Sequence, residues 1–331
     1  MEEFINTMPL PVVFVILLAG FVLLIKGADF FVDGSSSIAK RFKVPPVIIG
    51  LTIVAMGTSL PETAVSVTAS IAGKNSLAIS NVTGSNIFNT MMVIGVCALL
   101  TPVLVQKETL KRDIPFAAIC ACLLAGLGIL GFGDDSDMTV GNIDGIILLV
   151  LFAVYIAVLV GAALKSKKEA AAEAAPEDGE IKLIPMWLSL LFIVGGAAAI
   201  IVGGDLTVDS ASRIALSFGM SETLVGLTIV SIGTSLPELV TSVVAARKDE
   251  VDMALGNAIG SSVFNILMVI GIAAAISPIS VMTENLIDLG VLLCFTLVVW
   301  LFAYTKRKIT RAEGAVMVLM YVAYAVYICI R

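Results

Sequence analysis

One thirteen-residue segment occurs twice in this 331-residue chain, and it constrains the fold more than any other feature. The first copy, Gly50–Glu62, reads GLTIVAMGTSLPE, and the second, Gly226–Glu238, reads GLTIVSIGTSLPE. The copies lie 176 residues apart (238 − 62), and residues 27–102 align with residues 203–278 at this offset without a gap. A duplication at a fixed offset indicates that one structural unit occurs twice. We therefore expect two related halves.

The composition is typical of a membrane protein. Hydrophobic residues make up 59% of the chain and charged residues 14%, whereas soluble domains are about 45–50% apolar and about 25% charged. The sequence has no basic stripe with interleaved aromatic residues, which argues against nucleic-acid binding. Histidine is absent, so imidazole proton relays and the commonest transition-metal ligand are excluded. The cysteines lack the spacing of zinc sites or disulfide frameworks: Cys97, Cys120, Cys122, Cys294 and Cys329.

Ten segments are long and apolar enough to cross a bilayer as helices, which takes about 20 residues each. We therefore expect an all-α integral membrane protein with ten transmembrane helices. The expected helices cover residues 11–33, 45–71, 77–100, 114–132, 142–164, 186–209, 221–246, 252–276, 285–304 and 312–330.

Lysine and arginine are unevenly distributed among the loops between these helices. Alternate loops hold sixteen of the 20 basic residues, the opposite side holds Lys74, Arg213 and Arg331, and Lys26 lies within the first helix. Basic loops remain on the cytoplasmic side, so both termini are expected outside. The chain begins with the acidic Met1–Glu3 rather than the basic start of a secretory signal. We expect a multi-pass protein of the cell inner (cytoplasmic) membrane, surrounded by lipid, with no obligate protein partner.

The loop charges also give the duplication a geometry. Five helices separate the two copies of the motif, and because five is odd, the second copy enters the membrane upside down. Inverted repeats of this kind bring their motifs together near the middle of the bilayer. We expect a first repeat of five helices in residues 1–164, a cytoplasmic linker loop in residues 165–182, and a second, inverted repeat of five helices in residues 183–331.

Each copy of the motif places a glutamate in the middle of an apolar segment. An ionised side chain at this depth costs at least about 2.5–3.5 kcal/mol, so Glu62 and Glu238 are functional candidates. A protonated or ion-paired structural glutamate is the alternative, but the two segments contain no lysine or arginine to pair with them. We expect the two carboxylates to share one site.

The residues before each glutamate could supply further oxygen ligands. Pro61 and Pro237 lack an N–H and are expected to free backbone carbonyls upstream, while Gly57 and Gly233 allow the backbone to deviate. The candidate ligands are the carbonyls of Ala55 and Ser231 and the hydroxyls of Thr58, Ser59, Thr234 and Ser235. Oxygen ligands with two negative charges suit a hard cation such as Ca²⁺, Na⁺ or K⁺. For any single hydroxyl, ordinary packing and back-bonding to the helix remain an alternative.

The following segment in each half adds a second duplicated pattern. Ser85 and Asn89 are four residues apart, as are Ser261 and Asn265, so each pair shares a helix face. We interpret the asparagines, and less strongly the serines, as ligands. Gly84 and Gly260 could instead mark a close helix contact. Four duplicated aspartates lie near the ends of expected helices. They could line an ion entrance or simply occupy helix ends, and we assign them no role: Asp29, Asp33, Asp205 and Asp209.

At these motifs the sequence resembles the sodium/calcium exchanger (cation/calcium antiporter) superfamily, of the bacterial or archaeal calcium/sodium antiporter type. In that family G-T-S-x-P-E in one helix is followed by G-S-x-x-x-N in the next, and here the resemblance covers the whole chain. It implies ten helices in two inverted halves, with the second, third, seventh and eighth as a core past which the first and sixth slide. It also implies exchange of several Na⁺ for one Ca²⁺, with K⁺ or H⁺ used in some branches, and no cofactor.

The resemblance also implies roles for individual residues. Glu62 and Glu238 would coordinate Ca²⁺, and Asn89 and Asn265 would line the centre of the site. The flanking Na⁺ sites would be formed by Thr58, Ser59, Thr234, Ser235, Ser85 and Ser261 with the carbonyls of Ala55 and Ser231. Some relatives carry aspartate at the position of Asn265, and this departure puts K⁺ dependence in doubt.

We interpret the chain as a transporter that exchanges Na⁺ for Ca²⁺ by alternating access, and not as an enzyme. Ca²⁺/H⁺ antiport is the main alternative, because burial raises the affinity of a glutamate for protons, and K⁺-dependent exchange is another. A channel with a glutamate selectivity ring fits less well, because broken helices in inverted repeats favour alternating access. An intramembrane protease has no recognisable catalytic arrangement here.

Overall fold

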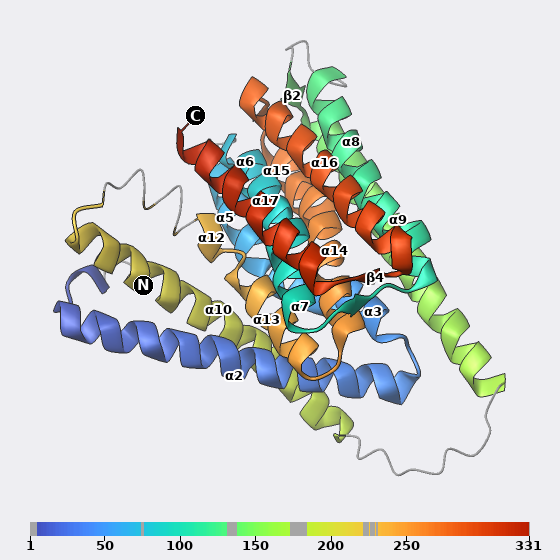
Figure 1. The fold of residues 1–331 in the computed structure, drawn as a ribbon. Coiled ribbons are helices and arrows are strands. Elements are labelled where there is room, and N and C mark those ends of the chain that lie inside the picture. The colour runs from blue at the N-terminus through green and yellow to red at the C-terminus, as the bar shows by residue number, and fades with distance from the viewer. Residues whose placement is uncertain are drawn as a thin grey trace.

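The computed structural model describes residues 5–73, 76–130, 138–172, 184–220, 225, 229 and 231–330. Figure 1 shows a bundle of helices in which two long helices, α2 and α10, lie together along one flank. The expected all-α fold is confirmed in this part of the chain. Two very short antiparallel strand pairs were not expected: β1 (Val103–Leu104) with β4 (Lys308–Ile309), and β2 (Thr139–Val140) with β3 (Ile279–Ser280).

Helices α2 (Leu10–Phe42) and α10 (Met186–Ser217) pack directly against each other (Figure 1). Glycines at the crossing allow the two backbones to approach closely. A Cβ atom on Gly27 would lie 2.9 Å from the carbonyl oxygen of Gly196, and one on Gly203 would lie 2.6 Å from the backbone nitrogen of Leu24. Most of the remaining surface of both helices is apolar and exposed, as expected for helices that face lipid.

The segment that carries the first motif is a broken helix. It consists of α3 (Pro46–Ile49), the π-helix η1 (Gly50–Val54), α4 (Ala55–Thr58) and α5 (Leu60–Ile71). The axis bends by 48° between residues 46–58 and residues 60–71. The break falls at Ser59, two residues before Pro61, because proline fits the first turn of a helix but not its interior.

The segment that carries the second motif contains α12 (Ser231–Gly233) and α13 (Leu236–Arg247), with Pro237 again in the first turn after the break. Residues 221–224, 226–228 and 230, which begin the expected helix 221–246, lie outside the described part of the chain. The two motif segments therefore share a helix break at the same position relative to proline.

Two further segments form the centre of the molecule. One contains α6 (Ser76–Ile87), the π-helix η2 (Phe88–Val93) and α7 (Ile94–Leu100); the other contains α14 (Val251–Phe264), η5 (Asn265–Ile270) and α15 (Gly271–Ile276). In each, 78% of the most apolar stretch is buried within the protein, against 17–39% for the other unbroken spans. Wide π turns often occur at functional sites, and each begins here within one residue of a candidate asparagine.

The outer helices are η3 (Thr109–Asp113) with α8 (Ile114–Leu130), α9 (Asn142–Ala172), α16 (Thr283–Lys306) and α17 (Arg311–Ile330). Among the described residues, eight helices are long and apolar enough to span a membrane, and the broken helix of residues 46–71 would be a ninth. The remaining expected span, residues 221–246, begins outside this part, so the number ten remains a prediction. Helix α9 extends to residue 172, so the first residues of the expected linker are helical.

Candidate cation site

The two glutamates are fully buried, and each accepts a hydrogen bond from the other copy of the motif. The hydroxyl of Ser235 donates to Oε1 of Glu62 at 3.2 Å, and the hydroxyl of Ser59 donates to Oε1 of Glu238 at 2.9 Å. Residues 173 and 179 positions apart in sequence therefore meet in one place, where each serine bonds to the glutamate of the other half.

The second oxygen of each carboxylate is an unused ligand. Oε2 of Glu62 and Oε2 of Glu238 are both buried and have no hydrogen-bond partner. The hydroxyl of Ser85 contacts Oε1 of Glu62 at 3.4 Å, so this contact does not provide a partner for Oε2. A buried carboxylate without a compensating partner is costly, because it has lost its hydration. The arrangement is suited to a cation that would occupy the space between the two groups.

The threonines of the two motifs differ in their surroundings. The hydroxyl of Thr58 donates to the carbonyl of Val54 at 3.2 Å and contacts Oδ1 of Asn257 at 3.1 Å. It also lies 3.5 Å from the hydroxyl of Ser261. The hydroxyl of Thr234 has no hydrogen-bond partner and lies at the wall of a cavity described below. Thr58 is therefore already tied to the protein, whereas Thr234 has an oxygen available for a ligand.

The expected release of the Ala55 carbonyl by proline is wrong in detail. This carbonyl accepts the N–H of Ser59 at 3.0 Å and contacts the hydroxyl of Thr58 at 3.4 Å. The reason is register: a proline at position 61 deprives the carbonyl four residues earlier, that of Gly57, of its donor. A carbonyl has two lone pairs, so Ala55 can still bind an ion.

The backbone of the second motif takes a tighter turn at the same place. The N–H of Ser235 donates to the carbonyl of Ile232 at 3.1 Å, a bond between residues three apart, where the first motif has a bond between residues four apart. Ser231, whose carbonyl is a candidate ligand, begins α12, and its side chain lies outside the described part. The two copies are thus not identical in conformation.

The glycines of the motif act differently from our expectation. Neither Gly57 nor Gly233 has a positive φ angle. A Cβ on Gly57 would lie 2.6 Å from the ring tip of Phe31 on α2, and one on Gly233 would collide with Val208 on α10. These glycines therefore allow α2 and α10 to pack closely over the two motifs.

The candidate asparagines and the neighbouring serines are also buried. Neither side-chain atom of Asn89 has a partner, and Oδ1 of Asn265 has none, although its Nδ2 donates to Asn86 at 3.1 Å. Ser85 and Ser261 lie on the same central helices, next to Glu62 and Thr58 respectively. Gly260 permits a close helix contact, whereas a Cβ on Gly84 would meet nothing within 4 Å.

Two asparagines that were not selected from the sequence support the glutamates. Asn81 donates to the hydroxyl of Ser66 at 3.0 Å and contacts the backbone carbonyl of Glu62 at 3.4 Å. Asn257 makes the corresponding contacts, to Ser242 at 2.9 Å and to the carbonyl of Glu238 at 3.4 Å. All four polar residues are duplicated at the same offset within apolar segments, and this signal could have identified them.

A cavity of about 480 Å³ reaches the site from one side. Its wall includes Thr234 and Pro237 of the second motif, Pro61 of the first, and Asp205 and Asp209 of α10. The cavity therefore connects two acidic side chains with an unpaired hydroxyl of the candidate site.

Ion pairs join α2 to the loop between α13 and α14. The ammonium of Lys248 lies 2.7 Å from Asp33 and 3.0 Å from Asp29, and Lys40 lies 2.9 Å from Glu250. Lys26 contacts Asp29 at 3.4 Å on the same helix. Partial burial alone would lower the pKa of Lys248, but the hydrogen bonds and charges of the two aspartates raise it above its usual value. This lysine therefore remains charged at neutral pH, and the ion pairs persist.

Comparison with known proteins decides the family. The family described as sodium/calcium exchanger protein matches residues 12–161 and 188–330, most of the chain. The chain belongs to the sodium/calcium exchanger family. This exchanger family is also the one that the paired motifs resemble.

Individual relatives agree with that membership. The sodium/calcium exchanger MaX1 of Methanosarcina acetivorans is 33% identical over 340 residues, covering 95% of this chain and 97% of MaX1. The inner membrane protein YrbG of Escherichia coli is 36% identical over 271 residues, covering 80% and 79%. A solved structure of the sodium-calcium exchanger NCX_Mj superposes with a TM-score of 0.80 at 32% identity, covering 97% of this exchanger and all of NCX_Mj.

The donor set of this exchanger is unlike that of a transition-metal site. Among the described residues, no three or more histidine, cysteine, aspartate or glutamate side chains are grouped to hold a metal. Two carboxylates, hydroxyls and amide oxygens are available instead, and such oxygen ligands suit hard cations that must be released again.

Proposed function

We propose that this protein exchanges Na⁺ for Ca²⁺ across the inner membrane, with both ions using the site between Glu62 and Glu238. The observation that carries the proposal is the pair of buried carboxylates, each with an oxygen that has no hydrogen-bond partner. Membership in the sodium/calcium exchanger family supports transport of these cations. The name of the relative YrbG supports the inner membrane as the location.

Charge balance explains why two different ions would exchange at this site. Two carboxylates can be balanced by one Ca²⁺ or by two or more Na⁺, and the empty doubly negative site is unfavourable in a medium of low dielectric constant. We propose that the protein changes conformation only when the pair is compensated. Ions then cross in both directions, while the empty protein rarely does.

The proposed ligand set contains the residues that surround the two carboxylates. Beside Glu62 and Glu238 it comprises Thr58, Ser59, Thr234, Ser235, Ser85, Ser261, Asn89 and Asn265, with the carbonyls of Ala55 and Ser231. Five side chains of this set have a buried polar atom that lacks a partner, which supports the assignment for them most directly: Glu62, Asn89, Thr234, Glu238 and Asn265.

We further propose ten helices in two inverted repeats, residues 1–164 and 183–331, joined by residues 165–182 on the cytoplasmic side, with both termini outside. The reciprocal Ser59–Glu238 and Ser235–Glu62 contacts support this symmetry. In this orientation the cavity that reaches Thr234 opens outward, and the ion pairs of Lys248 close the cytoplasmic side.

Alternating access would require the cytoplasmic ion pairs to break when the site opens inward. Replacing Lys248 with methionine removes its contacts to Asp29 and Asp33 and is expected to shift the population toward the inward-open state. The effect should be about two- to fivefold, the range of partly exposed ion pairs. The readout is the labelling rate of an Ala64→Cys reporter, at the wall of the outer cavity, by a membrane-impermeant thiol reagent; the rate should fall.

The matched control is Lys26→Met, because the ion pair of Lys26 with Asp29 lies within α2 and does not join two helices. Its labelling rate should equal that of the parent protein. Equal rates for the parent and the Lys248→Met variant would contradict the closing role of Lys248.

Flux measurements in proteoliposomes test the function and separate its alternatives. Ca²⁺ uptake should require an outward Na⁺ gradient and should be unaffected by an imposed pH gradient or by K⁺. If a pH gradient alone drove uptake equally well, the protein would be a Ca²⁺/H⁺ antiporter. An absolute requirement for K⁺ would indicate K⁺-dependent exchange, and rapid uptake without any counter-ion would indicate a channel.

A further inference from the structure

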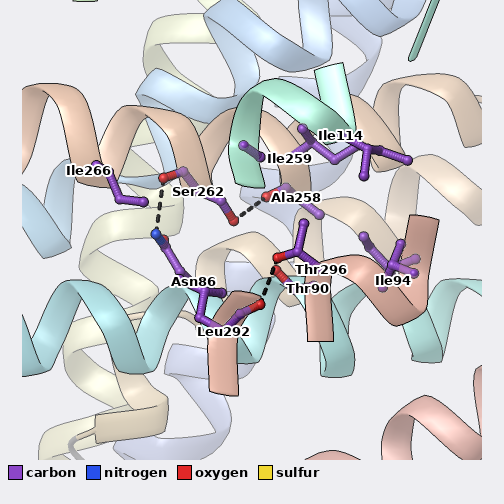
Figure 2. Close-up of a pocket in the computed structure, with 12 residues that line it drawn as sticks. Asn86, Thr90, Ile94, Ile114, Ala258, Ile259, Ser262, Ile266, Leu292 and Thr296 are labelled. Atoms are coloured by element: carbon purple, nitrogen blue, oxygen red, sulfur yellow. Dashed lines mark hydrogen bonds between the residues drawn. The ribbon is translucent and has the colours of Figure 1, made fainter. Parts of the chain in front are cut away.

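Asn86 links the two central helices and contacts a candidate ligand without belonging to the ligand set. It lies on α6, fully buried, beside a small cavity of about 20 Å³. Its Nδ2 donates to the backbone carbonyl of Ser262 on α14 at 3.0 Å, as Figure 2 shows. Its Oδ1 accepts the Nδ2 of Asn265 at 3.1 Å.

This pair of contacts fixes which way both amides point. A backbone carbonyl can only accept a hydrogen bond, so Asn86 must turn its NH₂ group toward Ser262. Its carbonyl oxygen then faces Asn265, which must answer with its own NH₂ group. Oδ1 of Asn265 is consequently directed away from Asn86, and it is buried without a partner. The reverse orientation of either amide would oppose two donors or two acceptors.

The corresponding residues of the other half are arranged differently. Ser262 occupies the position that corresponds to Asn86, 176 residues later. Its hydroxyl donates to the carbonyl of Ala258 in its own helix at 3.0 Å (Figure 2). Asn89, the counterpart of Asn265, has no partner on either Nδ2 or Oδ1. Asn265 is therefore fixed with its oxygen turned away from Asn86, whereas the amide of Asn89 can rotate.

We propose that Asn86 is a positioning residue that holds the carbonyl oxygen of Asn265 toward the bound cation. The proposal rests on the proposed function, in which Asn265 borders the ion. A free amide presents either its oxygen or its NH₂ group, and the positive end of the NH₂ dipole repels a cation. Groups that orient a metal ligand commonly affect metal affinity by about 10- to 100-fold.

The main test compares Asn86→Ala in two backgrounds, using Ca²⁺ binding to the purified protein measured by calorimetry. In the wild-type background we expect the dissociation constant for Ca²⁺ to rise roughly tenfold. In the Asn265→Asp background a carboxylate presents oxygen in every rotation, so removing Asn86 should cause no loss of affinity. Such dependence of one substitution on another isolates the coupling between two residues.

Controls separate this role from damage to the fold. Thr296→Val alters the same cavity by removing the hydroxyl that donates to Leu292 at 2.8 Å (Figure 2), and it should leave Ca²⁺ affinity unchanged. Asn86→Ser, which installs the residue found at the equivalent position, is the second variant if the alanine variant does not fold. An equal loss of affinity in both backgrounds, or no loss in either, would overturn the proposal.

The outcome for Asn86 is distinguishable from that for the transport function. Calorimetry reports Ca²⁺ binding whether or not Na⁺ drives transport, so a failure of Na⁺-coupled flux in wild-type protein would leave the Asn86 comparison intact. Conversely, wild-type Na⁺-driven flux with an unchanged dissociation constant in Asn86→Ala would reject the positioning role alone.

Discussion

Replacing Glu62 or Glu238 with glutamine is expected to lower Ca²⁺ transport by roughly 30-fold or more. Glutamine keeps the shape of the side chain and can still accept the hydrogen bond of Ser235 or Ser59. It removes one of the two charges that balance the ion, and losing one partner of a buried charge pair costs about 2–5 kcal/mol. Because 1.4 kcal/mol corresponds to a factor of ten, the effect is large. Initial uptake of radioactive Ca²⁺ into proteoliposomes measures it.

The matched control is Asp144→Asn, a buried carboxylate on α9 that accepts the N–H of Gly141 at 2.9 Å. Asparagine can accept the same bond, so this variant should transport at the wild-type rate. Wild-type flux in either glutamate variant, with normal protein yield, would show that the two carboxylates do not bind the transported ion.

Replacing Gly260 with alanine is expected to lower the thermal stability of the protein strongly. A Cβ at this position would lie 2.7 Å from the Cα of Leu51 and 2.9 Å from the Cβ of Ala55, where α14 crosses the π-helix of the first motif. Overpacking of this kind typically costs about 1–3 kcal/mol in the free energy of unfolding. Here the obstructing atoms include backbone, which cannot rotate away. The unfolding temperature in detergent measures the effect.

Gly84 provides the matched control, because it occupies the corresponding position in the first half. A Cβ there would meet nothing within 4 Å, so Gly84→Ala should retain the unfolding temperature of the wild type. Equal unfolding temperatures for Gly260→Ala and the wild type would contradict the close packing of α14 against the first motif.

The sequence predicted the features that depend on hydrophobicity and duplication. Long apolar segments predicted the helices, and the glutamates within apolar segments indicated the candidate site, because an ionisable group is rarely retained in lipid without a function. The prolines correctly predicted the helix breaks. Inversion predicted that Glu62 and Glu238 would meet, and the structure brings their motifs together through Ser235 and Ser59.

The sequence could not predict features that depend on which atoms reach one another. Nothing in the motif indicates that each serine would bond to the glutamate of the other copy. The π-helices at Gly50–Val54 and Asn265–Ile270 were not predicted, because their sequences carry no local signature of a wide turn. The error at Ala55 arose because its carbonyl has an ordinary helical donor, the N–H of Ser59.

The internal repeat identifies only functional residues that both halves share. Residues that differ between the halves give no such signal. Asn86 corresponds to Ser262, and Lys248 corresponds to Ala72, so neither attracted attention in the sequence. These two positions make the halves unequal, and the difference concerns one candidate amide ligand and the proposed closure of the cytoplasmic side.

In the proposed mechanism Na⁺ and Ca²⁺ compete for the same pair of buried carboxylates. Binding of radioactive Ca²⁺ to the purified protein, measured at increasing Na⁺ concentration, distinguishes one shared site from two separate sites. We expect about one Ca²⁺ per chain, complete displacement by Na⁺ with a steep dependence on its concentration, and loss of binding in Glu62→Gln and Glu238→Gln. Undiminished Ca²⁺ binding at saturating Na⁺ would show that the ions occupy separate sites and would contradict this mechanism.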